Sequence, residues 1–465
     1  MSTLTSSQWP WTHIACASSH TALRNSGLFV LSIAALFALQ PKLSGNISNF
    51  LLPCATLFIT LATHAILRPP ANVPRWSEVG TIIVILLLFA VVQLAPEIRN
   101  RSWIFLIAMS AGGILTCAGI GVCARISLRR ILERRKVFIG ASIALLITLL
   151  FLVKDTALLQ RISAILGIGA GTVNNFSWLG FSYIAFRLIG TLRDASAGRL
   201  PAMSLSEFVT YVVFAPALIA GPIERAERFV SDLRATWVVN IPDFVAGMQR
   251  IAIGSLKKFI FADTLAMMAL HPINAPHVHA GIPTWVVAYA YALQIFFDFA
   301  GYSDMAIGAA RCLGIRLPEN FANPYFAPNL TQFWHRWHMS LTQWIRAYYF
   351  NPLARALRRR ELSPAVIIAT AQVSTMLLIG LWHGVSMNFA VWGLWHGIGL
   401  FLHNRWNEFA RRRLAIPEER LGLQRTANIV GAFVTFHYVT LGWVWFALPN
   451  PSMSLLVFRK LFGIG

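Results

Sequence analysis

Histidines in tryptophan-rich motifs are the residues in this chain whose types and spacing could support chemistry. Two of them, His335 and His338, lie in the run Gln-Phe-Trp-His-Arg-Trp-His-Met-Ser at 332–340. His383 lies in Gly-Leu-Trp-His-Gly at 380–384, and His396 follows in a second Trp-His-Gly. A buried neutral histidine can take up and return a proton, as a general base in acyl transfer must do. A histidine that only bonds to a neighbouring helix carbonyl is an equally good interpretation of His383.

The spacing of the first two histidines predicts a helix. His335 and His338 are three residues apart, as are Trp334 and Trp337, so one helix would carry adjacent polar and aromatic stripes, with Trp344 further along. Spacing alone favours an amphipathic helix whose tryptophans lie among lipid headgroups. A metal-binding pair is a weaker interpretation, because no carboxylate or cysteine completes a ligand set.

Motifs for covalent catalysis are absent from the sequence. There is no Gly-x-Ser-x-Gly elbow and no phosphate-binding glycine loop, and the five cysteines are scattered outside any catalytic motif. The residues therefore favour direct transfer, in which a base activates an incoming hydroxyl group.

The composition indicates a polytopic membrane protein. Of the 465 residues, 56% are apolar and only 12% charged, and the mean hydropathy is +0.60. A soluble domain has about 25% charged residues. The net charge is +21, and the basic residues lie between apolar runs, with clusters at 125–136, 355–360 and 411–413. This pattern is typical of cytoplasmic loops facing an anionic leaflet and argues against a nucleic-acid partner.

Charge-free runs predict an all-α fold of about ten to twelve helices. The first six runs are 25–41, 43–67, 79–96, 102–124, 137–153 and 162–186, the last with a break at Asn174 and Asn175. In the second half, 264–297 predicts two helices around a histidine-rich loop, and 362–404 predicts two helices joined near Gly384. Thr426 to Phe458 supplies one or two more.

Residues 298–346 do not fit a simple span. Asp298 and Asp304 lie among apolar residues, and ionisable groups at membrane depth indicate function. The stretch from 311 to 329 contains Pro318, Pro324 and Pro328 and cannot be a lipid-facing helix. Such backbone must be covered by protein or line a wet cavity.

The ordered motifs resemble the membrane-bound O-acyltransferase family, in its bacterial branch of alginate O-acetylases and teichoic acid D-alanyl transfer proteins. The resemblance covers roughly residues 175–445. It rests on several ordered segments: Leu-Ile-Ala-Gly-Pro-Ile-Glu-Arg at 218–225, Gly-Ser-Leu-Lys-Lys at 254–258 with Ala262 and Asp263, Tyr-Ala-Leu-Gln-Ile-Phe-Phe-Asp-Phe-Ala-Gly-Tyr-Ser-Asp-Met-Ala-Ile-Gly at 291–308, Asn-Phe at 320–321, Asn-Pro-Tyr at 323–325, Phe-Trp-His-Arg-Trp-His-Met-Ser-Leu at 333–341, Trp-Ile-Arg at 344–346, and Gly-Leu-Trp-His-Gly at 380–384.

The resemblance implies helices around a central funnel and tunnel, with short interfacial helices near 325–350 on the cytoplasmic side. It implies a core at 161–465, preceded by weakly matched transmembrane helices at 1–160. His383 would be the general base and His338 would orient or polarise the reacting groups, with His396 as the competing base. The remaining expected tunnel and substrate-positioning residues are Asp298, Tyr302, Asp304, Trp334, His335, Arg336, Trp337, Ser340, Arg346, Trp382 and Asn388.

Among these residues, Asp298, Tyr302 and Asp304 are expected to brace the tunnel wall. Arg336 and Arg346 are expected to hold the donor's phosphates, although helix packing or lipid headgroups explain both arginines equally well.

The leading hypothesis is transfer of an acetyl or other short acyl group to a hydroxyl of an envelope polysaccharide or its carrier protein. The donor would be acetyl-CoA or an acyl carrier protein thioester on the cytoplasmic side of a bacterial inner membrane, with no bound cofactor or metal. A periplasmic acceptor or second acyltransferase is the expected partner besides the bilayer. The alternatives are D-alanyl or lipid-directed acyl transfer, a proton-coupled transporter or flippase, and a scaffold for envelope synthesis.

Overall fold

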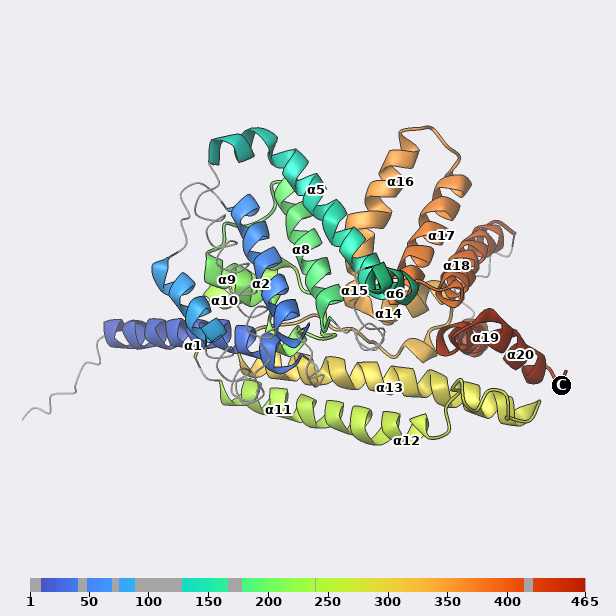
Figure 1. Cartoon of the computed structure of the whole chain (residues 1–465). Coiled ribbons are helices and arrows are strands. Elements are labelled where there is room, and N and C mark those ends of the chain that lie inside the picture. The colour runs from blue at the N-terminus through green and yellow to red at the C-terminus, as the bar shows by residue number, and fades with distance from the viewer. Residues whose placement is uncertain are drawn as a thin grey trace, which may run out of the picture. The chain divides into compact units, whose positions relative to one another are not determined.

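The computed structural model describes residues 10–40, 48–68, 75–87, 128–165, 178–238, 240–413 and 421–464, and these residues form helices and connecting loops without a strand. The all-α prediction is confirmed. The elements, drawn in Figure 1, are α1 (Pro10–Ala38), α2 (Ser48–Leu67), α5 (Leu128–Lys154), α6 (Thr156–Ile165), α8 (Phe181–Ser196), α9 (Leu205–Val212), η1 (Ala215–Ala217), α10 (Ala226–Arg234), α11 (Ile241–Ser255), η2 (Leu256–Ala262), α12 (Asp263–Ala266), α13 (Ile282–Cys312), η3 (Pro324–Phe326), α14 (Leu330–Arg336), α15 (Met339–Ile345), η4 (Arg346–Phe350), α16 (Asn351–Arg358), α17 (Pro364–His383), α18 (Met387–Arg413), α19 (Leu421–Ala447) and α20 (Pro451–Leu461).

Within the described residues, five helical segments are long and apolar enough to cross a membrane: Ser19–Ala38, Arg135–Lys154, Ile282–Cys312, Pro364–His383 and Arg425–Ala447. Shorter apolar helices lie at Leu52–Leu67, Trp76–Leu87 and Leu205–Ala217. The predicted span at 102–124 and the break at Asn174 and Asn175 lie outside the described residues. The total of ten to twelve helices therefore stays a prediction.

The chain divides into two compact units, each described by itself. The first comprises residues 1–149, 160–249 and 306–317. In it, α9 packs against α1, α2, α8 and α10. The buried Arg187 donates to the carbonyls of Val212 and Ala217 at 2.8 and 2.7 Å, which satisfies its guanidinium inside an apolar core. Burial also raises the pKa of Glu224, in the loop before α10, to about 7.

The second unit comprises residues 150–159, 250–305 and 318–465 and contains the predicted histidines. Its main feature is the antiparallel pair α17 and α18, joined by a short turn at 384–386 as predicted (Figure 1). α17 begins at Ser363 and Pro364, because the Ser363 hydroxyl accepts from the Val366 N–H and proline suits the first helical position.

Glycines set the spacing of α17 and α18. A Cβ added at Gly393 would lie 2.6 Å from the Met376 oxygen, and one at Gly380 would lie 2.2 Å from the Phe389 oxygen. Small residues allow membrane helices to approach this closely, so that van der Waals packing, rather than a hydrophobic difference from lipid, holds the pair together. The contact fixes the end of α17, where His383 lies.

The prolines between α13 and α14 interrupt helical structure, as predicted. After α13 ends at Cys312 the chain forms loops and a single 3-10 turn at η3. The prediction of one helix carrying both His335 and His338 is wrong. α14 ends at Arg336, and His338 has a left-handed backbone with φ 44° before α15 begins.

Candidate active site

His383 is the last residue of α17, and its ring packs against three aromatic side chains. The ring centroids of Trp382, Phe446 and Trp392 lie 4.6, 4.8 and 5.5 Å from that of His383. The His383 side chain is nevertheless only partly buried. An imidazole in this position is held by its neighbours and remains accessible to a reacting group.

Steric constraints explain why a glycine, Gly384, follows His383. A Cβ at Gly384 would lie 2.6 Å from the ring of Phe389, whose centroid is 6.2 Å from that of His383. Any larger residue would displace Phe389. The Trp-His-Gly motif therefore combines the histidine with the space that its aromatic neighbour Phe389 needs.

His338 is buried, with 3% of its surface exposed, and adopts the left-handed conformation that non-glycine residues rarely occupy. The centroids of its ring and of the Phe299 ring lie 4.6 Å apart in an edge-to-face arrangement, and its Nε2 has no hydrogen-bond partner. A strained backbone and a buried unpaired nitrogen both cost free energy, and such features concentrate at functional sites.

Asn320 holds the backbone on the far side of His338. Its carbonyl accepts from the Met339 N–H at 2.9 Å, and its Oδ1 accepts from the Ser340 hydroxyl at 2.6 Å. The Asn320 amide donates in turn to Ser303 on α13 at 3.0 Å. Ser340, predicted as a positioning residue, thus acts through Asn320 to keep the turn at His338 closed.

Trp382 lies between the two histidines. Its ring centroid is 4.6 Å from that of His383 and 6.3 Å from that of His338. Lys154, at the end of α5, donates to the Trp382 carbonyl, and its ammonium lies 4.8 Å from the Trp382 ring centroid. The predicted pair His338 and His383 is therefore brought together around one indole, with a cation beside it.

His396, the competing base, is enclosed. None of its surface is exposed, and the rings of Trp392 and Trp334 lie 5.0 and 5.2 Å away. Neither of its ring nitrogens has a hydrogen-bond partner. A Cβ at Gly442 would lie 2.6 Å from its Nε2, so no space remains beside it. A substrate cannot reach His396 without rearrangement of the core.

Trp334 and Trp337 belong to the aromatic core around the histidines. The Trp337 ring stacks on that of Phe333 with centroids 5.6 Å apart, and its centroid lies 5.0 Å from that of Trp443. Both tryptophans are buried, at 6% and 5% exposure. Burial excludes the interpretation that these two residues lie among lipid headgroups.

A cavity of about 290 Å³ lies between α14, α15, η4, α17 and α18 and is lined by His335 and Arg346. Three residues of its lining each have a buried polar atom without a hydrogen-bond partner: Trp334 Nε1, Gln372 Oε1 and Thr375 Oγ1. Buried polar groups are normally paired, so three unpaired polar atoms on residues that line one cavity are unusual. The cavity wall on α17 extends to Ile379, one turn before His383.

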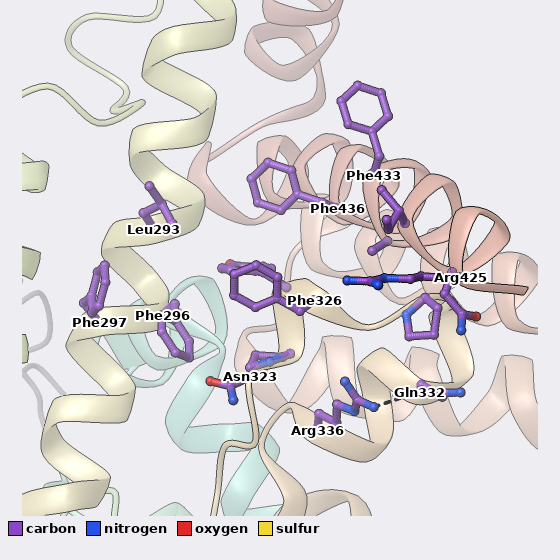
Figure 2. A pocket seen from close by; sticks show the side chains of 16 residues that line it. Leu293, Phe296, Phe297, Asn323, Phe326, Gln332, Arg336, Arg425, Phe433 and Phe436 are labelled. Carbon is purple, nitrogen blue, oxygen red and sulfur yellow. Dashed lines mark hydrogen bonds between the residues drawn. The ribbon is translucent and has the colours of Figure 1, made fainter. Parts of the chain in front are cut away.

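Arg336 lines a different cavity, of about 940 Å³, between α13, η3, α14 and α19 (Figure 2). Its guanidinium donates to Gln332 at 3.1 Å. The two arginines predicted to hold donor phosphates, Arg336 and Arg346, thus line separate cavities.

The acidic residues of α13 form ion pairs with α11 and η2. Asp304 accepts from Arg250 at 2.8 Å and from Lys257 at 2.6 Å, and Asp298 pairs with Lys258. Tyr302 lies on α13 between them, four residues after Asp298. These contacts stabilise the packing of α13 rather than placing a free carboxylate beside the histidines.

Asn388 lies at the start of α18 and connects it to the C-terminal helices. Its amide donates to the Leu448 carbonyl at 2.7 Å and to the Ser454 hydroxyl at 2.9 Å. Asn388 has 1% exposure, and its position fixes where α18 begins after the turn that follows His383.

Several residues of this arrangement were not predicted as site residues. Lys154 ends a charge-free run, and that single charge is the signal that could have identified it. Asn320 belongs to an Asn-Phe pair within the proline-rich stretch, where a polar side chain among loops indicates a structural contact. Gln372 and Thr375 are polar residues within the apolar run of α17.

Comparison with known proteins identifies the family of the chain. Residues 125–447 match the membrane-bound O-acyltransferase (MBOAT) family. The chain belongs to this family. The family match includes α5 with Lys154, both histidine motifs and all the aromatic residues that surround His383.

Curated MBOAT relatives act on bacterial envelope polymers. The chain is 31% identical over 294 residues to teichoic acid D-alanyltransferase of Streptococcus thermophilus, covering 60% of this chain and 70% of that protein. It is 35% identical over 291 residues to the protein named "Probable alginate O-acetylase AlgI" of Pseudomonas fluorescens, covering 62% and 54%. The peptidoglycan O-acetyltransferase of Helicobacter pylori is 32% identical over 267 residues, covering 56% and 48%. The chain thus matches about half the length of the two acetylases.

Proposed function

We propose that the protein transfers an acetyl or other short acyl group from a cytoplasmic thioester to a hydroxyl group of a bacterial cell-envelope polysaccharide or its carrier protein. The observation that carries the proposal is the partly accessible His383 beside Trp382, with the buried His338 on the same indole. The names of the relatives support an envelope polymer as acceptor and the bacterial inner membrane as the location.

In the proposed reaction His383 is the general base. Its neutral imidazole takes the proton of the acceptor hydroxyl as the oxygen attacks the thioester carbonyl carbon. The tetrahedral intermediate collapses with cleavage of the C–S bond, and the proton passes from His383 to the leaving sulfur. An ester and a free thiol result. A base of this kind contributes about 10²–10⁴-fold to the rate.

His338 is proposed to orient the thioester. Its Nε2 has no protein hydrogen-bond partner, so a thioester carbonyl that entered beside Trp382 would supply the partner that this nitrogen lacks. The left-handed turn held by Asn320 fixes the direction of the side chain. A preorganised donor aimed at the carbonyl oxygen would stabilise the developing charge. Its position across Trp382 from His383 supports the proposal that the two histidines act on one reacting centre.

We propose that the 290 Å³ cavity receives the arm of the donor. The amide groups of a pantetheine chain would pair with Gln372 Oε1, Thr375 Oγ1 and Trp334 Nε1, and its phosphate with Arg346. Thr375→Val should raise the KM for the donor about tenfold, since an unpaired buried amide costs about 1–3 kcal/mol. The kcat should change little. A fall in kcat at unchanged KM would contradict this assignment.

The test of the proposed base is His383→Ala. We expect at least a hundredfold loss of transfer of radiolabelled acyl groups to the envelope polymer in membranes with normal protein levels. His437→Gln is the matched control, because His437 also lies on a spanning helix but bonds to Tyr289 and to the Phe433 carbonyl. Undiminished acylation in the His383 variant would contradict the assignment of His383 as the general base.

The identity of the acyl group is a separate question, because the relatives include both O-acetylases and D-alanyltransferases. Supplying the membranes with acetyl-CoA or with a D-alanyl carrier-protein thioester distinguishes the two. We expect acetyl transfer, and transfer from the D-alanyl thioester alone would select the alternative.

A further inference from the structure

The larger cavity in the second unit has two chemically different parts. It is bounded by α13, η3, α14 and the first half of α19, and its lining contains no acidic residue among the residues described there (Figure 2). Two arginines, Arg336 and Arg425, lie on its α14 and α19 sides. The rest of the wall is mainly aromatic and aliphatic. No histidine lines this cavity, and none of its lining residues also lines the proposed donor cavity.

The apolar wall is too exposed for a soluble protein surface. Phe326 and Phe433 have 77% and 65% of their surface exposed, and Ile429 has 65%. Phe433 and Ile429 belong to the membrane-spanning segment Arg425–Ala447. Exposed aromatic and aliphatic groups on such a helix are stabilised by contact with hydrocarbon. An acyl chain therefore fits this wall.

The arginines lie where a headgroup would be. Arg425 lies four residues after Leu421, where α19 begins, and it is exposed. An arginine this close to the end of a spanning helix extends its charged group to the level of the membrane surface. Phe433 and Phe436 follow eight and eleven residues later, about 12 and 17 Å along α19 at the helical rise. Arg336 approaches from α14, where Gln332 holds its guanidinium. Positive charge at one end and aromatic rings along the depth match an anionic lipid.

We propose that this cavity binds one anionic phospholipid, with its phosphate between Arg336 and Arg425 and an acyl chain along Phe433, Phe436 and Phe296. The site is independent of the proposed acyl transfer. The lipid would tie α19 to the η3–α14 segment, since Tyr325 of η3 lines the cavity and packs against Trp337, the residue before His338.

The test measures lipid binding by the full chain. Protein stripped of lipid in detergent is titrated with phosphatidylglycerol or phosphatidylcholine, with tryptophan fluorescence as the readout and native mass spectrometry to count bound lipids. We expect one tightly bound phosphatidylglycerol and at least tenfold weaker phosphatidylcholine. Each arginine near a membrane surface contributes about a fivefold change in affinity for anionic lipid. The double variant Arg336→Gln, Arg425→Gln should therefore bind phosphatidylglycerol about 25-fold more weakly.

Matched variants keep the result interpretable. Arg358→Gln with Arg360→Gln removes two charges at the exposed end of α16 and should leave the affinity unchanged. The single variants Arg336→Gln and Arg425→Gln should each weaken binding about fivefold, which preserves the test if the double variant unfolds. Binding within twofold of wild type in both single variants would overturn the proposal. So would equal affinity for phosphatidylcholine, or displacement of the lipid by CoA or inorganic phosphate at equal concentration.

Discussion

The spacing of α17 and α18 can be tested directly by adding one methyl group. In Gly393→Ala the new Cβ would lie 2.6 Å from the Met376 oxygen and 2.8 Å from the Leu377 Cα. Both neighbours are backbone atoms, so a side-chain rotation cannot relieve the contact. Ordinary contacts begin at 3.4 Å, and the two helices must therefore move apart by about 0.8 Å.

The displacement should affect both stability and activity. Overpacking of this kind typically costs about 1–3 kcal/mol. A shift near 1 Å can reduce catalysis by about 10²-fold. His383 ends α17 while Trp392, which packs against its ring, is on α18. We therefore expect acyl transfer to fall about tenfold to a hundredfold per folded molecule, with a lower thermal unfolding temperature.

The assay compares acyl transfer with unfolding followed by tryptophan fluorescence. Gly140→Ala is the matched control, because Gly140 lies within the apolar part of α5 and a Cβ there would meet nothing within 4 Å. That variant should retain activity and gain up to about 1 kcal/mol from helix propensity. Full activity and unchanged stability in Gly393→Ala would refute the argument that close helix contact positions His383.

Three further predictions follow from buried polar and charged groups. His396→Met removes two ring nitrogens that have no hydrogen-bond partner, so the free energy of unfolding should stay equal or rise by about 1 kcal/mol. Acyl transfer should remain within a few fold of wild type. A hundredfold loss of acyl transfer would instead identify His396 as the base. Glu224→Gln should be more stable than wild type above pH 7, by up to roughly 3 kcal/mol, because burial raises the pKa of Glu224 from about 4.5 to about 7. The folded state then binds the proton more tightly than the unfolded state, so wild-type stability should fall as pH rises from 4.5 through 7, whereas thermal unfolding of the variant should lack this slope. Asp304→Asn leaves Arg250 paired with Glu319 but weakens the contact of α13 with α11 and η2. The free energy of unfolding should fall by about 1–2 kcal/mol, while acyl transfer stays within tenfold of wild type. Complete loss of function without loss of folded protein would favour a proton relay and hence the transporter hypothesis.

Helix formation was largely predictable because it depends on local pattern. The charge-free run at 362–404 predicted two helices joined near Gly384, and α17 and α18 have that arrangement. The prolines between 311 and 329 predicted irregular structure, because proline removes a donor and obstructs the preceding turn. The single helix over His335 and His338 could not be excluded locally, since Asn320 stabilises the interruption from outside that segment.

The chemistry of the site was predictable only as a set of candidates. The motifs identified His338, His383 and His396 as candidates, and His383 and His396 each lie in their own copy of the sequence Trp-His-Gly. Burial distinguishes them, because rings from α14 and α18 enclose His396 while His383 keeps an exposed part. Arg336 and Arg346 were equivalent in sequence but line different cavities.

The sequence by itself determined that this protein is a helical membrane protein with an acyltransferase motif set, because hydropathy, charge distribution and motif order are properties of short segments. Tertiary structure decided which histidine is accessible, how His338 is held in a left-handed turn, and which residues with unpaired polar atoms line a common cavity. Each of these depends on atoms from helices far apart in the chain, such as Trp382 beside His338 or Gly442 beside His396. A contact between residues far apart in the chain leaves no periodic pattern in the sequence, because it depends on single residues and not on a repeat.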